Sequence, residues 1–95
     1  MPHTLGRVLS LLGQLGEGRI LEQKAVESFG RQGDPRLEGV ARTYLAEIAL
    51  AAGQPGEAEQ EAKAAVTLLK VAPSLRVAAT AVLARTLLAT GQAAQ

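Results

Sequence analysis

The chain has 95 residues, enough for one small domain, and 47% of them are apolar. It contains one Phe, one Tyr and no Trp, so its core must be built from Ala, Leu and Val, a composition that favours helices over strands. The net charge of +1, with acidic and basic residues interspersed, argues against a nucleic-acid partner, and the lack of cysteine excludes disulfides and thiolate chemistry.

The N-terminal third predicts two helices, over residues 3–12 and 16–30. Between them the sequence GQLGE at residues 13–17 is expected to form a turn, because a glycine can end one helix and a glutamate favours the start of the next. The first apolar stretch is interrupted by Gly, Arg, Ser and Gln, and it is too short for a signal peptide or a membrane span. We therefore expect a soluble, cytoplasmic protein with no membrane partner.

The next predicted helix covers residues 35–52, where apolar residues recur every three or four positions. Asp34 can cap its first turn, and Pro35 suits the first helical position, where a missing N–H is harmless. Gly53 follows the last turn, where a left-handed residue commonly ends a helix.

A fourth helix is predicted over residues 55–70, beginning at Pro55. Its apolar stripe lies on one helical face and consists of Ala58, Ala62, Ala65, Val66 and Leu69.

The last predicted helix, over residues 74–90, is apolar nearly all round. Such a helix should be buried on all sides, and a fully exposed leucine costs roughly 1.5–3 kcal/mol. We therefore expect the isolated chain to be a homo-oligomer, most simply a two-fold dimer that either apposes these helices through Leu83 and Leu87 or exchanges helices between subunits.

The chain repeats itself at intervals of 40 and then 38 residues. GQLGE at 13–17 reappears as GQPGE at 53–57, and GQAAQ begins at residue 91. A shift of 38 positions aligns several further pairs: Pro35 with Pro73, Leu37 with Leu75, Ala41 with Ala79, Leu45-Ala46 with Leu83-Ala84, and Leu50-Ala51 with Leu88-Ala89. The single domain, residues 1–95, thus divides into units of about 1–34, 35–72 and 73–95, the last incomplete.

These units resemble the tetratricopeptide repeat family. The resemblance rests on a leucine followed by a small residue in each first helix, a glycine at each turn, small residues in the second helix, and a trailing proline: Leu5-Gly6, Leu45-Ala46, Leu83-Ala84, Gly13, Gly53, Gly91, Gly18, Ala25, Ala58, Ala65 and Pro73. It implies an all-α fold in which antiparallel helical hairpins, about five helices in all, stack as a right-handed solenoid.

The chain departs from the family pattern in two ways. Its units span 38–40 residues rather than about 34, and the expected large aromatics are replaced by Arg42, Thr80, Glu22 and Ala62. Such long, Ala/Leu-rich units resemble the arrays appended to bacterial signalling ATPases and serine/threonine kinases.

No constellation of residues predicts catalysis or a metal or cofactor site. His3 is the only histidine and has no cysteine partner, so we interpret it as a terminal residue of no chemical role. The glycine-rich turns lack the Lys-Ser or Lys-Thr of a phosphate-binding loop, and no strand precedes them. We expect a protein that is not an enzyme.

Arg7, Glu47 and Arg85 follow the Leu-small dipeptides of the three first helices, so they share one register. The resemblance implies that this register faces the concave groove where the family binds its ligands, and we expect Tyr44 to adjoin it. An equally weighted interpretation is a solvated charged face. The chain contains no Asn, which disfavours the family's carboxylate clamp for chaperone C-termini.

The sequence therefore predicts a protein–protein interaction module that binds a protein or peptide partner in a concave groove. The alternative is a fragment of a longer repeat array, acting as a self-association or regulatory region of a bacterial signalling protein.

Overall fold

Two turns of the same construction fold the first three helices against one another. The computed structural model describes residues 2–94, and the side chains of residues 13–91. At each turn a glycine adopts a positive φ, 69° at Gly33 and 76° at Gly53. The glycine amide and the next amide then bond back to the closing helix, as Gly53 N does to Leu50 O at 3.1 Å and Gln54 N to Ala49 O at 2.8 Å. A proline follows two residues after each glycine and begins the next helix.

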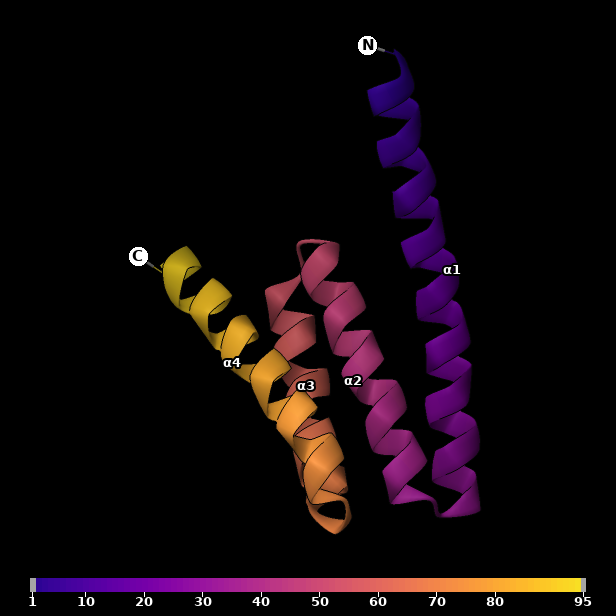
Figure 1. The fold of residues 1–95 in the computed structure, drawn as a ribbon, viewed down its shortest axis with the longest axis vertical. Helices are drawn as coiled ribbons and strands as arrows, with labels where there is room; N and C mark the ends of the chain where they lie inside the picture. The colour runs from indigo at the N-terminus through magenta and orange to yellow at the C-terminus, as the bar shows by residue number, and fades with distance from the viewer. Residues whose placement is uncertain (1, 95) are drawn as a thin grey trace.

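The helices are α1 (Pro2–Gln32), α2 (Pro35–Ala51), α3 (Pro55–Leu68) and α4 (Pro73–Ala94), with a single 3-10 turn η1 (Leu69–Val71) between the last two. Successive helices run antiparallel, with α1 and α4 at opposite edges of the domain and α2 between them (Figure 1). Helix α2 packs against all three other helices, and α3 also packs on α4. The described part of the chain is thus an all-α domain of four antiparallel helices.

The prediction of separate helices over 3–12 and 16–30 is wrong. Residues 13–17 lie inside α1, and the described chain has four α-helices rather than about five. Glycine weakens a helix by about 1 kcal/mol, but nothing in GQLGE removes a backbone donor. GQPGE differs because Pro55 cannot continue the helix and forces Gln54 out of the helical region, to φ −120° and ψ 70°.

The predicted end of the last helix at residue 90 is wrong for the same reason. Gly91 is followed by Gln and Ala rather than by Gln and Pro, and α4 continues to Ala94. The start of α4 agrees with the sequence to one residue.

The core is made mainly of alanines at helical spacing. Seven of them are buried among the described residues: Ala41, Ala46, Ala49, Ala58, Ala62, Ala65 and Ala79. Small side chains let helix axes approach closely, and the largest fully buried side chains, Leu69, Val82 and Thr86, fill the remaining space. The buried hydroxyls of Thr43 and Thr86 donate to the carbonyls of Gly39 and Leu83 in their own helices.

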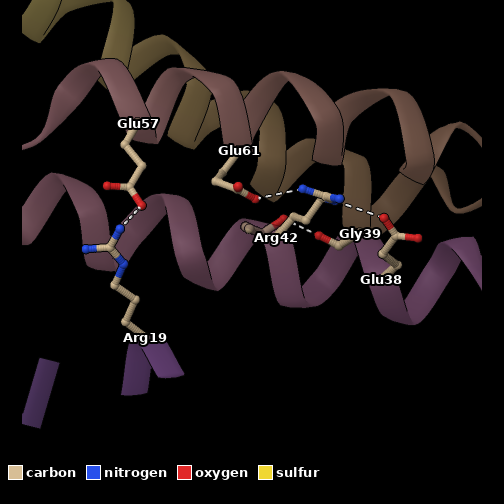
Figure 2. Close-up of polar contacts among 7 residues, drawn as sticks. Arg19, Glu38, Gly39, Arg42, Glu57 and Glu61 are labelled. Atoms are coloured by element: carbon tan, nitrogen blue, oxygen red, sulfur yellow. Dashed lines mark hydrogen bonds and ion pairs between the residues drawn. The ribbon is translucent and has the colours of Figure 1, made fainter. Parts of the chain in front are cut away.

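Charged side chains join α3 to α1 and α2. Arg42 donates from Nε to Glu38 Oε2 at 2.9 Å, and from Nη1 to Glu61 Oε2 on α3 at 3.0 Å (Figure 2). Partial burial opposes the charge on Arg42, but the bonds and charges of the two glutamates outweigh it and raise the pKa of the guanidinium. Arg19 on α1 pairs with Glu57 on α3 (Figure 2).

Candidate functional site

Tyr44 lies on the side of α2 that faces away from α3. Arg42 and Ala46, which meet α3, are each two residues from Tyr44, and at about 100° per residue this places them roughly 200° around the helix axis from the tyrosine. Tyr44 is 51% exposed, although tyrosine carries a large apolar surface that folding usually covers. This part of α2 therefore presents an aromatic side chain to solvent between α1 and α4.

Two hollows flank Tyr44. The first, of about 350 Å³, lies between α1 and α2 and is lined by Leu15, Gly18, Glu22, Tyr44, Glu47 and Ile48. Gly18 helps to form it, because a Cβ there would sit 3.5 Å from Ile48 Cδ1. This hollow is open and shallow, and apolar side chains supply most of its wall.

The second hollow, of about 220 Å³, lies between α2 and α4. Its lining residues are Val40, Thr43, Tyr44, Glu47, Leu69, Leu75 and Ala78. Tyr44 and Glu47 border both hollows, so they form a ridge between two shallow depressions. We call this ridge and its two hollows the Tyr44 surface.

Glu47 also links α2 to α4. Its Oε1 lies 3.9 Å from Arg85 Nη2, and the two side chains are 46% and 61% exposed. At this distance and exposure the pair contributes little to stability, because water screens it and both side chains lose rotamer freedom. Both charges stay accessible at the edge of the Tyr44 surface.

The structure brings three of the four predicted groove residues together. Tyr44, Glu47 and Arg85 lie on neighbouring parts of α2 and α4. Arg7 falls outside the described side chains. The assignment of these residues to a partner groove stays a prediction.

The two leucines predicted to form a self-association face lie in different environments. Leu83 is half-buried and packs against the cluster of Ala46, Ala62 and Val82. Leu87 is 47% exposed. Leu83 therefore lies at the margin of the buried face of α4. Val77 and Leu88 of the same helix are more exposed than either leucine, at 70% and 67%.

Two structural features were not predicted from the sequence. The approach of Leu69 to Gly39 depends on how α2 and η1 meet, and nothing local to Gly39 signals it. The Arg42 bridge was also missed, although the i,i+4 spacing of Glu38 and Arg42 could have indicated half of it.

Within residues 13–91 no group of three or more His, Cys, Asp or Glu side chains could hold a metal ion. No helix in the described part of the chain is long and apolar enough to cross a membrane.

The fold and this surface define a small all-α domain with an exposed aromatic ridge. No protein-family model matches the chain, and no curated protein or solved structure shows significant similarity to it.

Proposed function

We propose that the chain is a non-catalytic protein-interaction module that binds a peptide or helix of a protein partner on the Tyr44 surface. The observation that carries this proposal is the exposed tyrosine between two apolar hollows. Tyrosine is enriched among the residues that contribute most to binding energy, because it buries a large rigid area and loses little side-chain entropy.

The charges beside the tyrosine support selectivity. Glu47 and Arg85 are half-exposed or more, so a ligand can pair with either after their weak mutual contact opens. Charges of opposite sign at the rim of an apolar contact favour one ligand orientation and raise the association rate. A segment with a hydrophobic anchor between an acidic and a basic residue fits this arrangement.

The resemblance to the tetratricopeptide repeat family adds a geometrical reason. In that family the first helices of the hairpins line a concave groove. Helices α2 and α4 begin the units 35–72 and 73–95, so a right-handed solenoid arrangement would place the Tyr44 surface in such a groove.

Selection from a displayed peptide library tests the proposal. Peptides enriched on the full chain are expected to lose binding to Tyr44→Ala by roughly thirtyfold or more, the effect of removing a binding hot spot. Glu47→Arg should change which peptides bind, because it reverses the rim charge. Lys63→Glu on α3, away from this surface, is the matched control and should leave binding unchanged.

Two results would contradict the proposal. One is that no peptide is enriched more strongly on this chain than on a control helical domain of similar charge. The other is equal loss of binding in Tyr44→Ala and Lys63→Glu, which would mean that the peptides recognise no particular surface.

The second candidate is a self-association or regulatory region within a longer repeat array. The exposed apolar residues of α4, Val77, Leu87 and Leu88, favour it because monomeric domains seldom leave such a stripe uncovered. Sedimentation at micromolar concentration should then show a species larger than a monomer, and Leu87→Lys should weaken it. A monomer at high concentration would remove this candidate without affecting the first.

A further inference from the structure

Helix α4 has an open apolar face on the side away from the core. Six residues line a shallow hollow of about 600 Å³ along it: Pro73, Arg76, Val77, Thr80, Ala81 and Ala84. Leu88 continues this stripe one turn further and is 67% exposed. We call these seven residues the outer face of α4. Ala78 lies off this stripe and lines the hollow of the Tyr44 surface, so the two surfaces are separate.

The outer face of α4 has a counterpart in α2. The 38-position shift that aligns Pro35 with Pro73 also places residues of the two helices at equal register: Gly39 with Val77, Arg42 with Thr80, Ala46 with Ala84, and Leu50 with Leu88.

In α2 this register is covered by α3 and by Leu69 of the η1 turn that follows it. A Cβ on Gly39 would lie 2.6 Å from Leu69 Cγ, Ala46 is 0% exposed in a cluster with Ala62, and Arg42 pairs with Glu61. Figure 2 shows Glu61 of α3 reaching toward Arg42 of α2. The cover on this register of α2 is therefore an antiparallel helix with small apolar residues and a glutamate.

The α4 residues at the same register are bare. Val77 is 70% exposed and Leu88 67%, and Thr80 and Ala84 are also exposed. Two of the four paired positions keep the same residue, Ala46 with Ala84 and Leu50 with Leu88, and a helix on this face would continue the α2–α3 packing one unit further along the fold. An antiparallel helix is therefore the occupant that fits it.

The charged residues of α4 indicate which kind of helix would bind its outer face. The charged residues of α4 are Arg76 and Arg85, with no carboxylate between Pro73 and Ala94, and Arg85 already faces Glu47. Arg76 is exposed, one turn before Thr80, within reach of a glutamate at the register of Glu61. A second copy of α4 would bring no carboxylate of its own to Arg76, so charge complementarity favours an acidic helix over self-pairing.

The size of the Val77 side chain further restricts which helix can pack on this face. Val77 stands where α2 has Gly39, and even a Cβ at that register would clash with a leucine placed as Leu69 is. The occupant must therefore carry a small residue opposite Val77.

We propose that the outer face of α4 docks an acidic, alanine-rich amphipathic helix of a partner chain, antiparallel to α4, with a glutamate at the register of Glu61, one turn from Arg76, and a small residue opposite Val77. Because this face is separate from the Tyr44 surface, the proposal stands independently of peptide binding there, and it competes with the self-association candidate, which would use Val77 and Leu88.

The helix that covers α2 supplies the probe. A peptide of residues 54–71 carrying Leu69→Ala is titrated into the full chain while the methyl signals are followed by NMR. Saturable shifts are expected at Val77, Ala84 and Leu88, with a dissociation constant below about 1 mM. Ala84→Glu should abolish them, whereas the matched variant Ala78→Glu, on the other side of α4, should not.

A charge exchange tests the role of Arg76. The peptide with Glu61→Lys should bind the chain roughly five- to tenfold more weakly, and Arg76→Glu in the chain should restore binding. Because a short free peptide forms a helix poorly, the same segment is also attached after Gly91 in place of residues 92–95. This extension should raise Tm, and Ala84→Glu should cancel the rise.

Three results would overturn the proposal. The first is no saturable shift below about 1 mM together with no rise in Tm from the attached segment. The second is a charge exchange in which Arg76→Glu fails to restore binding. The third is a concentration-dependent shift of Val77 and Leu88 without peptide, which would assign the face to a second copy of the chain.

Discussion

Leu69 packs its side chain directly over Gly39, so that a Cβ on the glycine would lie 2.6 Å from Leu69 Cγ and 2.7 Å from Cδ2. Leu69 is 1% exposed and belongs to the cluster with Ala65 and Ala79, so it has little room to move aside. This contact sets how closely α2 and the end of α3 approach each other. Among the described glycines, Gly39 is the one at which an added Cβ would overlap its neighbours most.

Gly39→Ala should destabilise the protein by about 1–3 kcal/mol, because the overlap outweighs the helix propensity gained, about 1 kcal/mol. Urea unfolding followed by circular dichroism measures the change. Gly16→Ala, in α1 with nothing within 4 Å of the new Cβ, is the control and should be neutral or stabilising. In the double variant with Leu69→Ala, the cost of Gly39→Ala should largely disappear, since the overlapping atoms are gone. Additive costs would show that the overlap is not the cause.

Identical Gly-Gln pairs at 53–54 and 91–92 should respond oppositely to alanine. Gly53 has φ of 76°, so Gly53→Ala should cost about 1–2 kcal/mol of stability. Gly91 lies within α4 with open space at its Cβ, so Gly91→Ala should be neutral or stabilising by up to about 1 kcal/mol. Thermal unfolding of both variants checks this. Equal destabilisation would mean that Gly91 also ends a helix.

The Arg42–Glu61 pair should couple more strongly than the Lys63–Glu59 pair. The first joins two helices with both side chains less than one third exposed, whereas Lys63 is 60% exposed and pairs within α3. Double-mutant cycles with neutral variants should give about 1 kcal/mol for the first and about 0.3 kcal/mol for the second. Both couplings should fall as salt is added, the exposed pair more steeply. A larger coupling for Lys63–Glu59 would contradict this ranking.

Helix α1 should run unbroken through residues 13–17. We expect amide-to-α contacts three and four residues apart across Gly13, Gly16 and Gly18 in NMR spectra, because the backbone there is helical. Leu15→Pro creates the Gly-Gln-Pro of the α2–α3 turn and should interrupt those contacts. Interrupted contacts in the unaltered chain would restore the separate helices at 3–12 and 16–30.

The sequence alone determined the helical content of the chain and the positions of its helix cap and its proline-containing turn. The alanine and leucine content gave an all-α fold, and the Asp34 cap, Pro35 and the Gly53–Pro55 turn are where the sequence placed them, because these features act on the residues next to them. Asp34 accepts a bond from the Leu37 amide at 3.0 Å, as a capping residue should.

GQLGE and GQPGE share four of five residues, and the difference between them is again local: Pro55 forces Gln54 out of the helical region, whereas Leu15 lets α1 continue. What only the tertiary structure decided is which equivalent positions are covered, and which residues distant in the chain lie together. Val77 and Gly39 share a register, yet Leu69 of η1 packs over Gly39, whereas Val77 is 70% exposed. Tyr44, Glu47 and Arg85 lie in one region because α2 packs against α4, a contact between residues about forty positions apart that no local pattern fixes.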